Sequence, residues 1–178
     1  MTLNLGDLAP DFTAHTADGE RRFHEWLGTS WGVLFSHPAD FTPVCTTELG
    51  AVARLRDQFA ARDTKVAAIS VDPATAHRAW SADIAETQGA EGDFPLIADP
   101  DRRVATLYGM MHPHHDDTAS TGRHFGEILR VLDSLQLTAA HQLATPADWQ
   151  MGEDVIITPA VSNEEAARRF PHHRAIKP

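Results

Sequence analysis

Short apolar runs alternate with longer segments of helical periodicity over the first hundred residues of the chain. The runs are four to seven residues long, which is typical of buried strands rather than of helices. They cover residues 31–35, 65–71 and 94–97. Strands that are separated by helices predict βαβ units, in which the strands are parallel and the crossovers are right-handed.

The segments between these strands carry apolar residues every three or four positions, as one buried face of a helix requires. The first segment predicts one helix over residues 45–62, and its periodic residues are Leu49, Val52, Leu55 and Phe59. A second helix is predicted over residues 74–87, with Trp80 and Ile84 facing inward. The shorter predicted elements are a weak strand at 12–14, a turn at 18–19, helices at 22–27 and 102–108, a strand at 155–157 and a helix at 164–170.

Composition limits the class of protein. The 178 residues suggest one domain with an appended arm, and 42% hydrophobic residues are enough to form a core. A formal net charge of −10 argues against nucleic acid or an anionic membrane as a partner. The apolar runs are too short to span a bilayer, and the first residues do not resemble a secretory signal. We therefore expect a cytoplasmic protein.

Cys45 is the only cysteine of the chain. A single thiol cannot form an intramolecular disulfide, and it cannot build a zinc site from several thiolates. Two interpretations remain, a buried thiol without chemical function and a reactive thiol. The residues around Cys45 decide which of these is favoured.

These residues predict that Cys45 lies in the first turn of a helix. Thr42 is a good N-cap residue, and Pro43 suits the first helical position. Free backbone N–H groups and the positive end of the helix dipole stabilise an anion there. We therefore expect the pKa of Cys45 to lie below its usual value of about 8.5, with the Thr42 hydroxyl turned toward the sulfur. The setting favours the reactive thiol.

The spacing Pro-x-x-x-Thr-x-x-Cys is formed by Pro38, Thr42 and Cys45. The stretch from Phe35 to Gly50, which contains this spacing, resembles the active-site segment of the 1-Cys peroxiredoxins of the peroxiredoxin-6-like class. The resemblance continues through residues 6–12, 70–72, 79–81, 94–99, 121–130, 134–137 and 144–149.

The resemblance implies an α/β, thioredoxin-like fold with a central mixed sheet flanked by helices. This domain would cover residues 1–140, and a C-terminal arm would cover residues 141–178. In relatives the arm packs across a partner subunit, so we expect a homodimer. The alternative is an arm that folds back on its own domain.

The resemblance also implies a thiol-dependent peroxidase that uses neither a cofactor nor a metal. The Cys45 thiolate would attack hydrogen peroxide or an organic hydroperoxide and become a sulfenic acid. Thr42 would hold and polarise the peroxide, Pro38 would shield the thiolate from water, and His37 would lie close to the substrate pocket. An external reductant, either a small thiol or a thiol protein, would then restore Cys45.

One departure from the family lies after Met111. The family continues into two antiparallel strands, whereas residues 112–120 of this chain lead directly to Thr121 and contain no strand pattern. About 20 residues are missing, which is the length of two strands with their connection. The missing hairpin would carry the catalytic arginine and pair with residues 31–35 or their neighbours. Its loss should leave a sheet edge unpaired.

Arg123 matches a second arginine of the family and is the remaining candidate for the catalytic site. Because the first arginine is missing, a second class of function stays open. This alternative is a catalytically impaired, thioredoxin-fold redox sensor or binding protein.

Two further motifs have simpler interpretations. Residues 28–32 match the Gly-x-Ser-x-Gly pattern of hydrolases, with His24 nearby, and some relatives are credited with a phospholipase A2 activity at the residues that match Ser30 and His24. Ser30 precedes a predicted strand, so we favour a tight turn. The histidines and aspartates of residues 112–117 are of the types that bind zinc or copper, but we favour a polar loop whose metal site is adventitious or absent.

Overall fold

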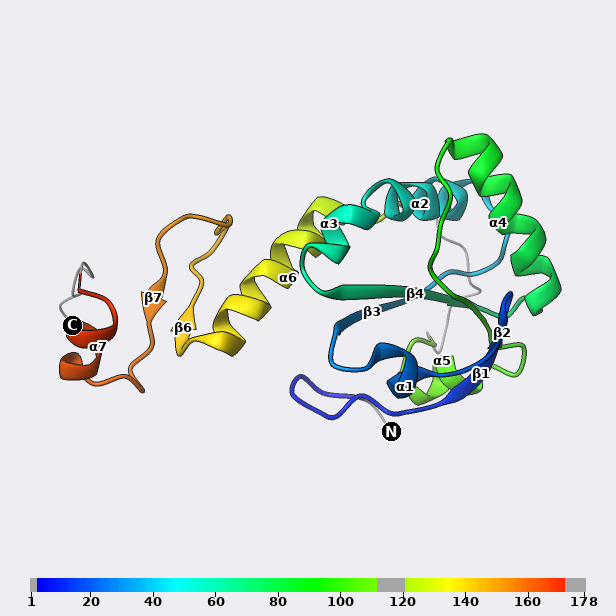
Figure 1. The fold of residues 1–178 in the computed structure, drawn as a ribbon. Coiled ribbons are helices and arrows are strands. Elements are labelled where there is room, and N and C mark those ends of the chain that lie inside the picture. Colours follow the sequence, from blue (N-terminus) through cyan, green and yellow to red (C-terminus); the bar gives the residue numbers. More distant parts are fainter. Residues whose placement is uncertain (1–2, 112–120, 172–178) are drawn as a thin grey trace. The chain divides into compact units, whose positions relative to one another are not determined.

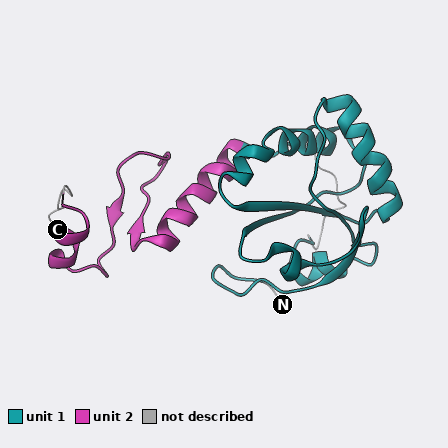
Figure 2. Cartoon of the chain, in the orientation of Figure 1, with its two compact units in different colours: residues 1–125 teal, residues 126–178 magenta. Residues whose placement is uncertain are grey.

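The computed structural model describes residues 3–111 and 121–171. The chain forms two compact units, residues 1–125 and residues 126–178 (Figure 2). The second unit includes a helix that the predicted boundary at residue 140 placed in the first domain. The boundary between the thioredoxin-like domain and the arm stays a prediction.

Unit 1 contains a five-stranded mixed sheet in the order β2-β1-β5-β4-β3 (Figure 1). Strands β3 and β4 pair in parallel, as do β4 and β5, whereas β1 is antiparallel to both β2 and β5. The parallel part is the one that the βαβ pattern predicted. The strands are β1 (Thr13–Thr16), β2 (Gly19–Arg22), β3 (Trp31–Ser36), β4 (Thr64–Ser70) and β5 (Leu96–Ala98).

Helices cover both faces of this sheet. Helices α2, α3 and α4 lie on one face, and α1 and α5 lie on the other (Figure 1). Their bounds are α1 (Phe23–Leu27), α2 (Pro43–Arg54), α3 (Arg56–Ala60), α4 (Ala74–Gln88) and α5 (Arg103–Leu107). The prediction of one helix over residues 45–62 is wrong, because the backbone leaves helical geometry at Leu55, with φ −94° and ψ 6°. The apolar periodicity continues through this break and so does not reveal it.

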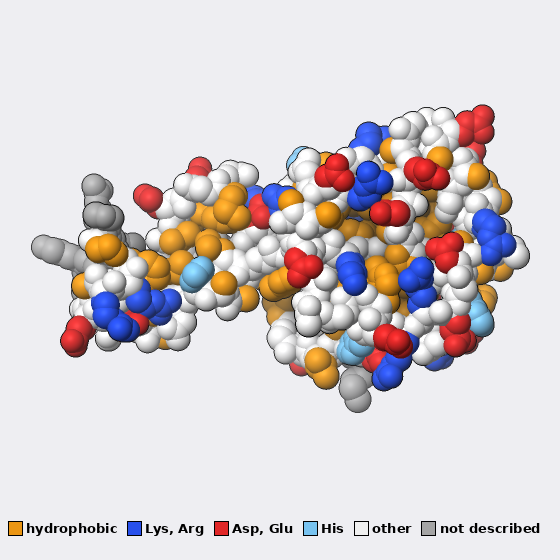
Figure 3. All heavy atoms as spheres, in the orientation of Figure 1, with side chains coloured by type: hydrophobic (Ala, Val, Ile, Leu, Met, Phe, Trp, Pro, Cys, Tyr) orange, Lys and Arg blue, Asp and Glu red, His pale blue; other side chains and the backbone are white. Residues whose placement is uncertain are grey.

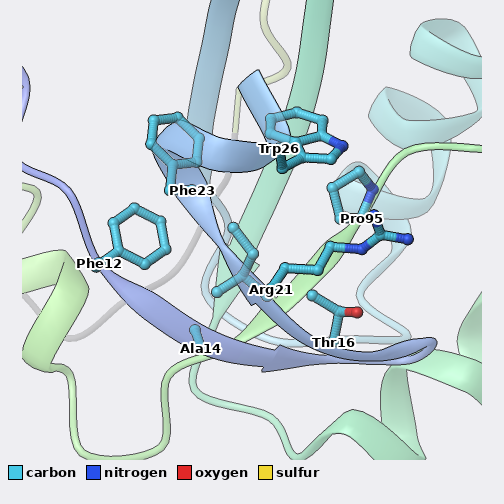
Figure 4. Close-up of a pocket in the computed structure, with 8 residues that line it drawn as sticks. Phe12, Ala14, Thr16, Arg21, Phe23, Trp26 and Pro95 are labelled. Atoms are coloured by element: carbon cyan, nitrogen blue, oxygen red, sulfur yellow. The ribbon is translucent and has the colours of Figure 1, made fainter. Parts of the chain in front are cut away.

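Strand β4 forms the centre of the core. Ala67, Ala68 and Ile69 are at most 1% exposed, and the small alanines allow the helices to approach the sheet closely. On the face of α1, Phe12 stacks on Phe23 with ring centroids 4.8 Å apart. These rings border a small pocket with Trp26 and Pro95 (Figure 4). Its volume of about 10 Å³ has room for no more than one water molecule.

Strand β3 is an edge strand in the described part of the chain, where its one partner in the sheet is β4. Trp31 and Gly32 are exposed, and Val33 and Leu34 are only half-buried. The predicted unpaired edge is therefore confirmed for the described residues. An edge of this kind leaves backbone N–H and C=O groups available for pairing.

Unit 2 consists of one long helix followed by short elements. These are α6 (Phe125–Ala140), β6 (Leu143–Ala144), β7 (Ile156–Ile157) and α7 (Asn163–Arg169). The first residue of α6 is the last residue of unit 1, and β6 pairs with β7 in antiparallel fashion. Trp149 is 2% exposed, and its Nε1 donates to the Glu153 carbonyl.

In the part of the chain that the structure describes, no helix has the length and hydropathy needed to cross a membrane.

Candidate active site

Cys45 lies where strand β3 leads into helix α2. Thr42 occupies the N-cap with extended backbone angles, and Pro43 is the first helical residue. Cys45 is therefore the third residue of the helix, as the sequence predicts, and its side chain is fully buried. The thiol lies beyond the carboxyl end of a parallel strand, where the sites of α/β proteins gather.

The Thr42 side chain does not cap the helix. Its hydroxyl donates to the Ala39 carbonyl at 2.9 Å, which makes the loop before α2 more rigid. Its own carbonyl accepts from both the backbone N–H and the hydroxyl of Thr46, each at 2.9 Å. Thr42 also lowers the pKa of Cys45, an effect that requires its one hydroxyl proton to turn from the Ala39 carbonyl to the sulfur.

Cys45 nevertheless has a raised pKa, so the expectation of a lowered one is wrong. Burial is the largest cause, because it removes water from the thiolate, and the Glu48 carboxylate adds to the effect. Thr42 and the Arg123 guanidinium act in the opposite direction and are outweighed. The helix start could be read from the sequence, but the depth of burial could not.

Arg123 comes to this site from a distant part of the chain. Its backbone N–H donates to Glu48 Oε1 at 2.7 Å, and its guanidinium Nη1 lies 2.5 Å from Glu48 Oε2. The guanidinium also contacts the Ser36 carbonyl and lies over the Phe35 ring. Glu48 is only 4% exposed, so Arg123 balances a buried charge at the end of β3 and the start of α2.

Glu48 is a residue that the sequence argument missed. A signal was available, because Glu48 follows Cys45 by three positions and precedes Val52 by four. It therefore shares the buried face of α2 with both residues. A carboxylate on a buried helix face requires a cationic or hydrogen-bonding partner, although the sequence does not identify Arg123 as that partner.

His37 belongs to a buried cluster centred on Asp40, a second residue that was missed. His37 Nε2 lies 3.0 Å from Asp40 Oδ1, and His77 Nδ1 lies 2.7 Å from Asp40 Oδ2. Burial acts to raise the pKa of Asp40, but the hydrogen bonds from the two imidazoles prevail and hold it below its usual value. Pro38 lies between His37 and Asp40 and is half-buried.

The other sequence candidates lie apart from this cluster. The Ser30 hydroxyl donates to Asp63 Oδ1 at 2.8 Å, and its backbone N–H donates to the Leu27 carbonyl. This geometry agrees with a turn that leads into β3. The backbone N–H of His24 donates to Asp11. The histidine-rich segment, residues 112–117, lies outside the described residues.

Comparison with known proteins gives a consistent result. Residues 5–157 match the family model described as AhpC/TSA family. A 1-Cys peroxiredoxin of Dictyostelium discoideum is 46% identical, over 95% of this chain and 79% of the relative. Peroxiredoxin-6 of Rattus norvegicus is 47% identical, over 95% of this chain and 89% of the relative.

Solved structures show the same relationship. Peroxiredoxin 6 of Arenicola marina, in a cysteine-to-serine mutant, has a TM-score of 0.89 and 43% identity, over 96% of this chain and 90% of that one. A yeast mitochondrial 1-Cys peroxiredoxin has a TM-score of 0.91 and 40% identity, over 99% and 96% of the two chains. The mixed sheet flanked by helices is thus the thioredoxin-like fold that the resemblance implied.

The sequence alignments also bear on the missing hairpin. They extend over 191 positions with the Dictyostelium protein and 199 positions with the rat protein, which is more than the 178 residues of this chain. Each relative therefore has residues without a counterpart here. This agrees with the interruption of the family pattern after Met111.

Proposed function

Because this chain belongs to the AhpC/TSA family, and within it to the 1-Cys peroxiredoxins, we propose that Cys45 is the nucleophile of its thiol peroxidase reaction. The observation that carries the assignment is the position of the only thiol. It lies in the first turn of α2, next to the Thr42 hydroxyl and within the influence of the Arg123 charge. A thiolate in such a position faces unpaired backbone N–H groups, which stabilise negative charge.

In the proposed reaction, the Cys45 thiolate attacks one oxygen of the peroxide. An S–O bond forms and the O–O bond breaks, so the sulfur is oxidised by two electrons and the peroxide is reduced. The leaving hydroxide or alkoxide takes up a proton and departs as water or an alcohol. Thr42 binds and polarises the peroxide, Pro38 excludes water, and His37 lies beside the substrate.

The sulfenic acid of Cys45 needs an external thiol for its reduction, because the chain has no second cysteine. The first thiol condenses with the sulfenic acid to form a mixed disulfide and water. A second thiol then exchanges with this disulfide and releases the Cys45 thiol. The yeast mitochondrial 1-Cys peroxiredoxin has a thiol-resolving mechanism that works via the glutathione and thioredoxin systems, and we propose a reductant of this kind here.

Arg123 is proposed as the arginine that supports the thiolate. Among the described residues, it is the arginine whose charge lowers the pKa of Cys45. Its ion pair with Glu48 reduces this effect, and burial of the thiol outweighs it. We therefore propose a slower peroxidase than the relatives that retain the hairpin.

A redox sensor that is oxidised once and slowly is the second candidate function. The raised pKa of Cys45 is the observation that favours it.

A homodimer is the proposed assembly. Figure 3 shows hydrophobic side chains on the visible surface of unit 2, and this unit contains large exposed apolar residues. They are Val131, Leu135, Met151 and Ile156, with exposed fractions from 38% to 60%. Apolar surface on so short a unit favours a partner subunit that covers it.

The proposed location is the cytoplasm, where a free thiol is kept reduced.

The test of the proposed function is peroxide consumption by the full chain with an added thiol. Glutathione with thioredoxin, and dithiothreitol as a general reductant, are supplied in excess over hydrogen peroxide. The wild type should turn over many times, and Cys45→Ser should not exceed the rate of the thiol alone. A Cys45→Ser variant that retains the wild-type rate contradicts the assignment, and a single slow turnover of the wild type favours the sensor.

A further inference from the structure

Asp40 joins three segments of unit 1 through its buried side chain and its backbone N–H. Its carboxylate bonds to His37, which follows strand β3, and to His77 in helix α4. Its backbone N–H donates to Asp72 Oδ2 at 2.8 Å, and Asp72 follows strand β4. The side chain of Asp40 is only 1% exposed. Asp40 therefore links the loop between β3 and α2 both to α4 and to the residues that follow β4.

The hydrogen bonds define how the two imidazoles are held. An ionised carboxylate only accepts hydrogen bonds, so His37 Nε2 and His77 Nδ1 carry the protons that face Asp40. The opposite nitrogens, His37 Nδ1 and His77 Nε2, are buried and make no hydrogen bond within the described residues. The hydrogen bond to Asp40 therefore fixes the tautomer and the orientation of each imidazole ring.

The next residue, Phe41, adopts a conformation that requires support. Its φ is 60°, in the left-handed region that residues other than glycine rarely enter. Its side chain is 53% exposed, so its own burial contributes little to holding this geometry. Hydrogen bonds on both sides restrain the backbone instead, from Asp40 to Asp72 and from Thr42 to Ala39.

The same face of α4 reaches the first turn of α2. Trp80, three residues after His77, packs against the His37 ring with centroids 4.9 Å apart. Its Nε1 donates to Thr46 Oγ1 at 3.1 Å, and that hydroxyl donates to the Thr42 carbonyl. Contacts thus run from Asp40 through α4 to Thr42, the N-cap residue of the helix that carries Cys45.

We propose that Asp40 and His77 are positioning residues of the peroxidase site, which hold the loop from Pro38 to Thr42 so that Thr42 and Cys45 meet the peroxide in the reactive geometry. Neither residue is required to touch the substrate. The catalytic part of this inference rests on the proposed function. The structural part, that His77 immobilises the loop through its bond to Asp40, does not.

The test compares two substitutions of His77 in the full chain. In His77→Asn, the side-chain amide can place an N–H near the position of the lost Nδ1 and keep the bond to Asp40. In His77→Phe, a ring still fills the space but cannot donate. For each protein, the rate constant of a single turnover with stoichiometric hydrogen peroxide is measured, together with thermal unfolding and hydrogen exchange of residues 37–46.

We expect His77→Phe to lower the rate constant by about 10- to 100-fold, the size of effect that a misplacement of about 1 Å can cause. We expect His77→Asn to stay within about threefold of the wild type. Exchange of residues 37–46 should rise in His77→Phe and return to the wild-type level in His77→Asn. An unchanged rate in His77→Phe overturns the catalytic part, and equal losses in both variants overturn the role of the hydrogen bond.

Two controls keep these outcomes separable. If His77→Phe does not fold, Asp40→Asn takes its place, because it is isosteric and removes the charge that accepts from both imidazoles. Its rate should also fall about 10-fold or more, and a wild-type rate overturns the proposal. If the wild type is no faster than Cys45→Ser, the proposed function fails. Hydrogen exchange then still decides whether His77 immobilises the loop.

Discussion

Arg123 and Glu48 are joined by two hydrogen bonds although they lie 75 positions apart in the chain. The pair brings a cation to the start of helix α2 and also supplies an anion one turn away from Cys45. Glu48 raises the pKa of Cys45 and Arg123 lowers it, so the two charges oppose each other at the thiol. Because Cys45 is also buried, the thiol is held in its protonated form more strongly than its helix position alone predicts.

Replacement of Glu48 by glutamine should make Cys45 more acidic. The substitution removes the carboxylate that raises the pKa of Cys45 and leaves the Arg123 charge in place. The pKa is measured from thiolate absorbance as a function of pH. Glu165→Gln, which removes one partner of an ion pair in unit 2, is the matched control and should leave the pKa unchanged. A Glu48→Gln variant with an unchanged or higher pKa contradicts this electrostatic account.

Replacement of Arg123 by methionine should destabilise unit 1 and raise the pKa of Cys45 further. The variant removes the cation that pairs with the buried Glu48 carboxylate and leaves the hydrogen bond from the backbone N–H of residue 123. Because the Arg123 side chain is 35% exposed and partly screened by water, we expect a loss of about 1–3 kcal/mol in the free energy of unfolding. Urea denaturation measures the loss. Arg123→Lys keeps the charge but loses the planar guanidinium that bonds to both Glu48 and the Ser36 carbonyl, so its stability should lie between methionine and the wild type.

The pH dependence of reactivity and of stability should have opposite signs at Cys45. Only the thiolate attacks peroxide, so the rate should still be rising with pH above the usual thiol pKa of about 8.5. The folded protein keeps its proton there while the unfolded chain loses it, so the unfolding free energy should fall as pH rises through this range. Peroxide kinetics and urea denaturation from pH 7 to 10 measure both trends. In Cys45→Ser the contribution of the thiol to the stability trend should vanish, and a slope equal to that of the wild type contradicts the account.

The edge strand β3 should make this protein less stable and less active than relatives with longer sequences. Its outer backbone groups and half-buried Val33 and Leu34 lack the cover that a further strand provides. Rat peroxiredoxin-6, 47% identical to this chain, is a suitable reference. Urea unfolding and peroxide consumption are compared under the same conditions. Cooperative unfolding at the same urea concentration, together with an equal rate, would refute the prediction.

Unit 2 should carry the dimer contact. The double variant Leu135→Glu and Met151→Glu places charges on two of its exposed apolar positions and should convert a dimer into a monomer. Light scattering coupled to size-exclusion chromatography measures the mass. Leu8→Glu introduces a charge at an exposed apolar position of unit 1 and should leave the dimer intact. A wild-type monomer would instead indicate an arm that folds back on its own domain.

Local signals in the sequence were enough to place Cys45. Thr42 and Pro43 marked the start of α2 because N-cap and first-turn preferences depend on neighbouring residues alone. Strands β3 and β4 were recognisable as apolar runs. Strand β2 was not, because its four residues, Gly19–Arg22, are all exposed and show no apolar alternation.

The parts that could not be predicted depend on contacts between distant residues. The His77 contact with Asp40 spans 37 positions, and the Arg123 contact with Glu48 spans 75. No periodicity or local spacing encodes such pairs. The raised pKa of Cys45 has the same origin, because it follows from how deeply the folded sheet and helices bury the thiol.

The most direct test of the assignment is the mass of the Cys45 peptide after one equivalent of hydrogen peroxide. Attack by the Cys45 thiolate should leave a sulfenic acid at Cys45, trapped by dimedone, that disappears when thioredoxin or glutathione is added before the trap. Repeated turnover is expected when peroxide and reductant are both in excess. An unmodified Cys45 after peroxide treatment, or peroxide consumption that persists in Cys45→Ser, would contradict the assignment of Cys45 as the nucleophile.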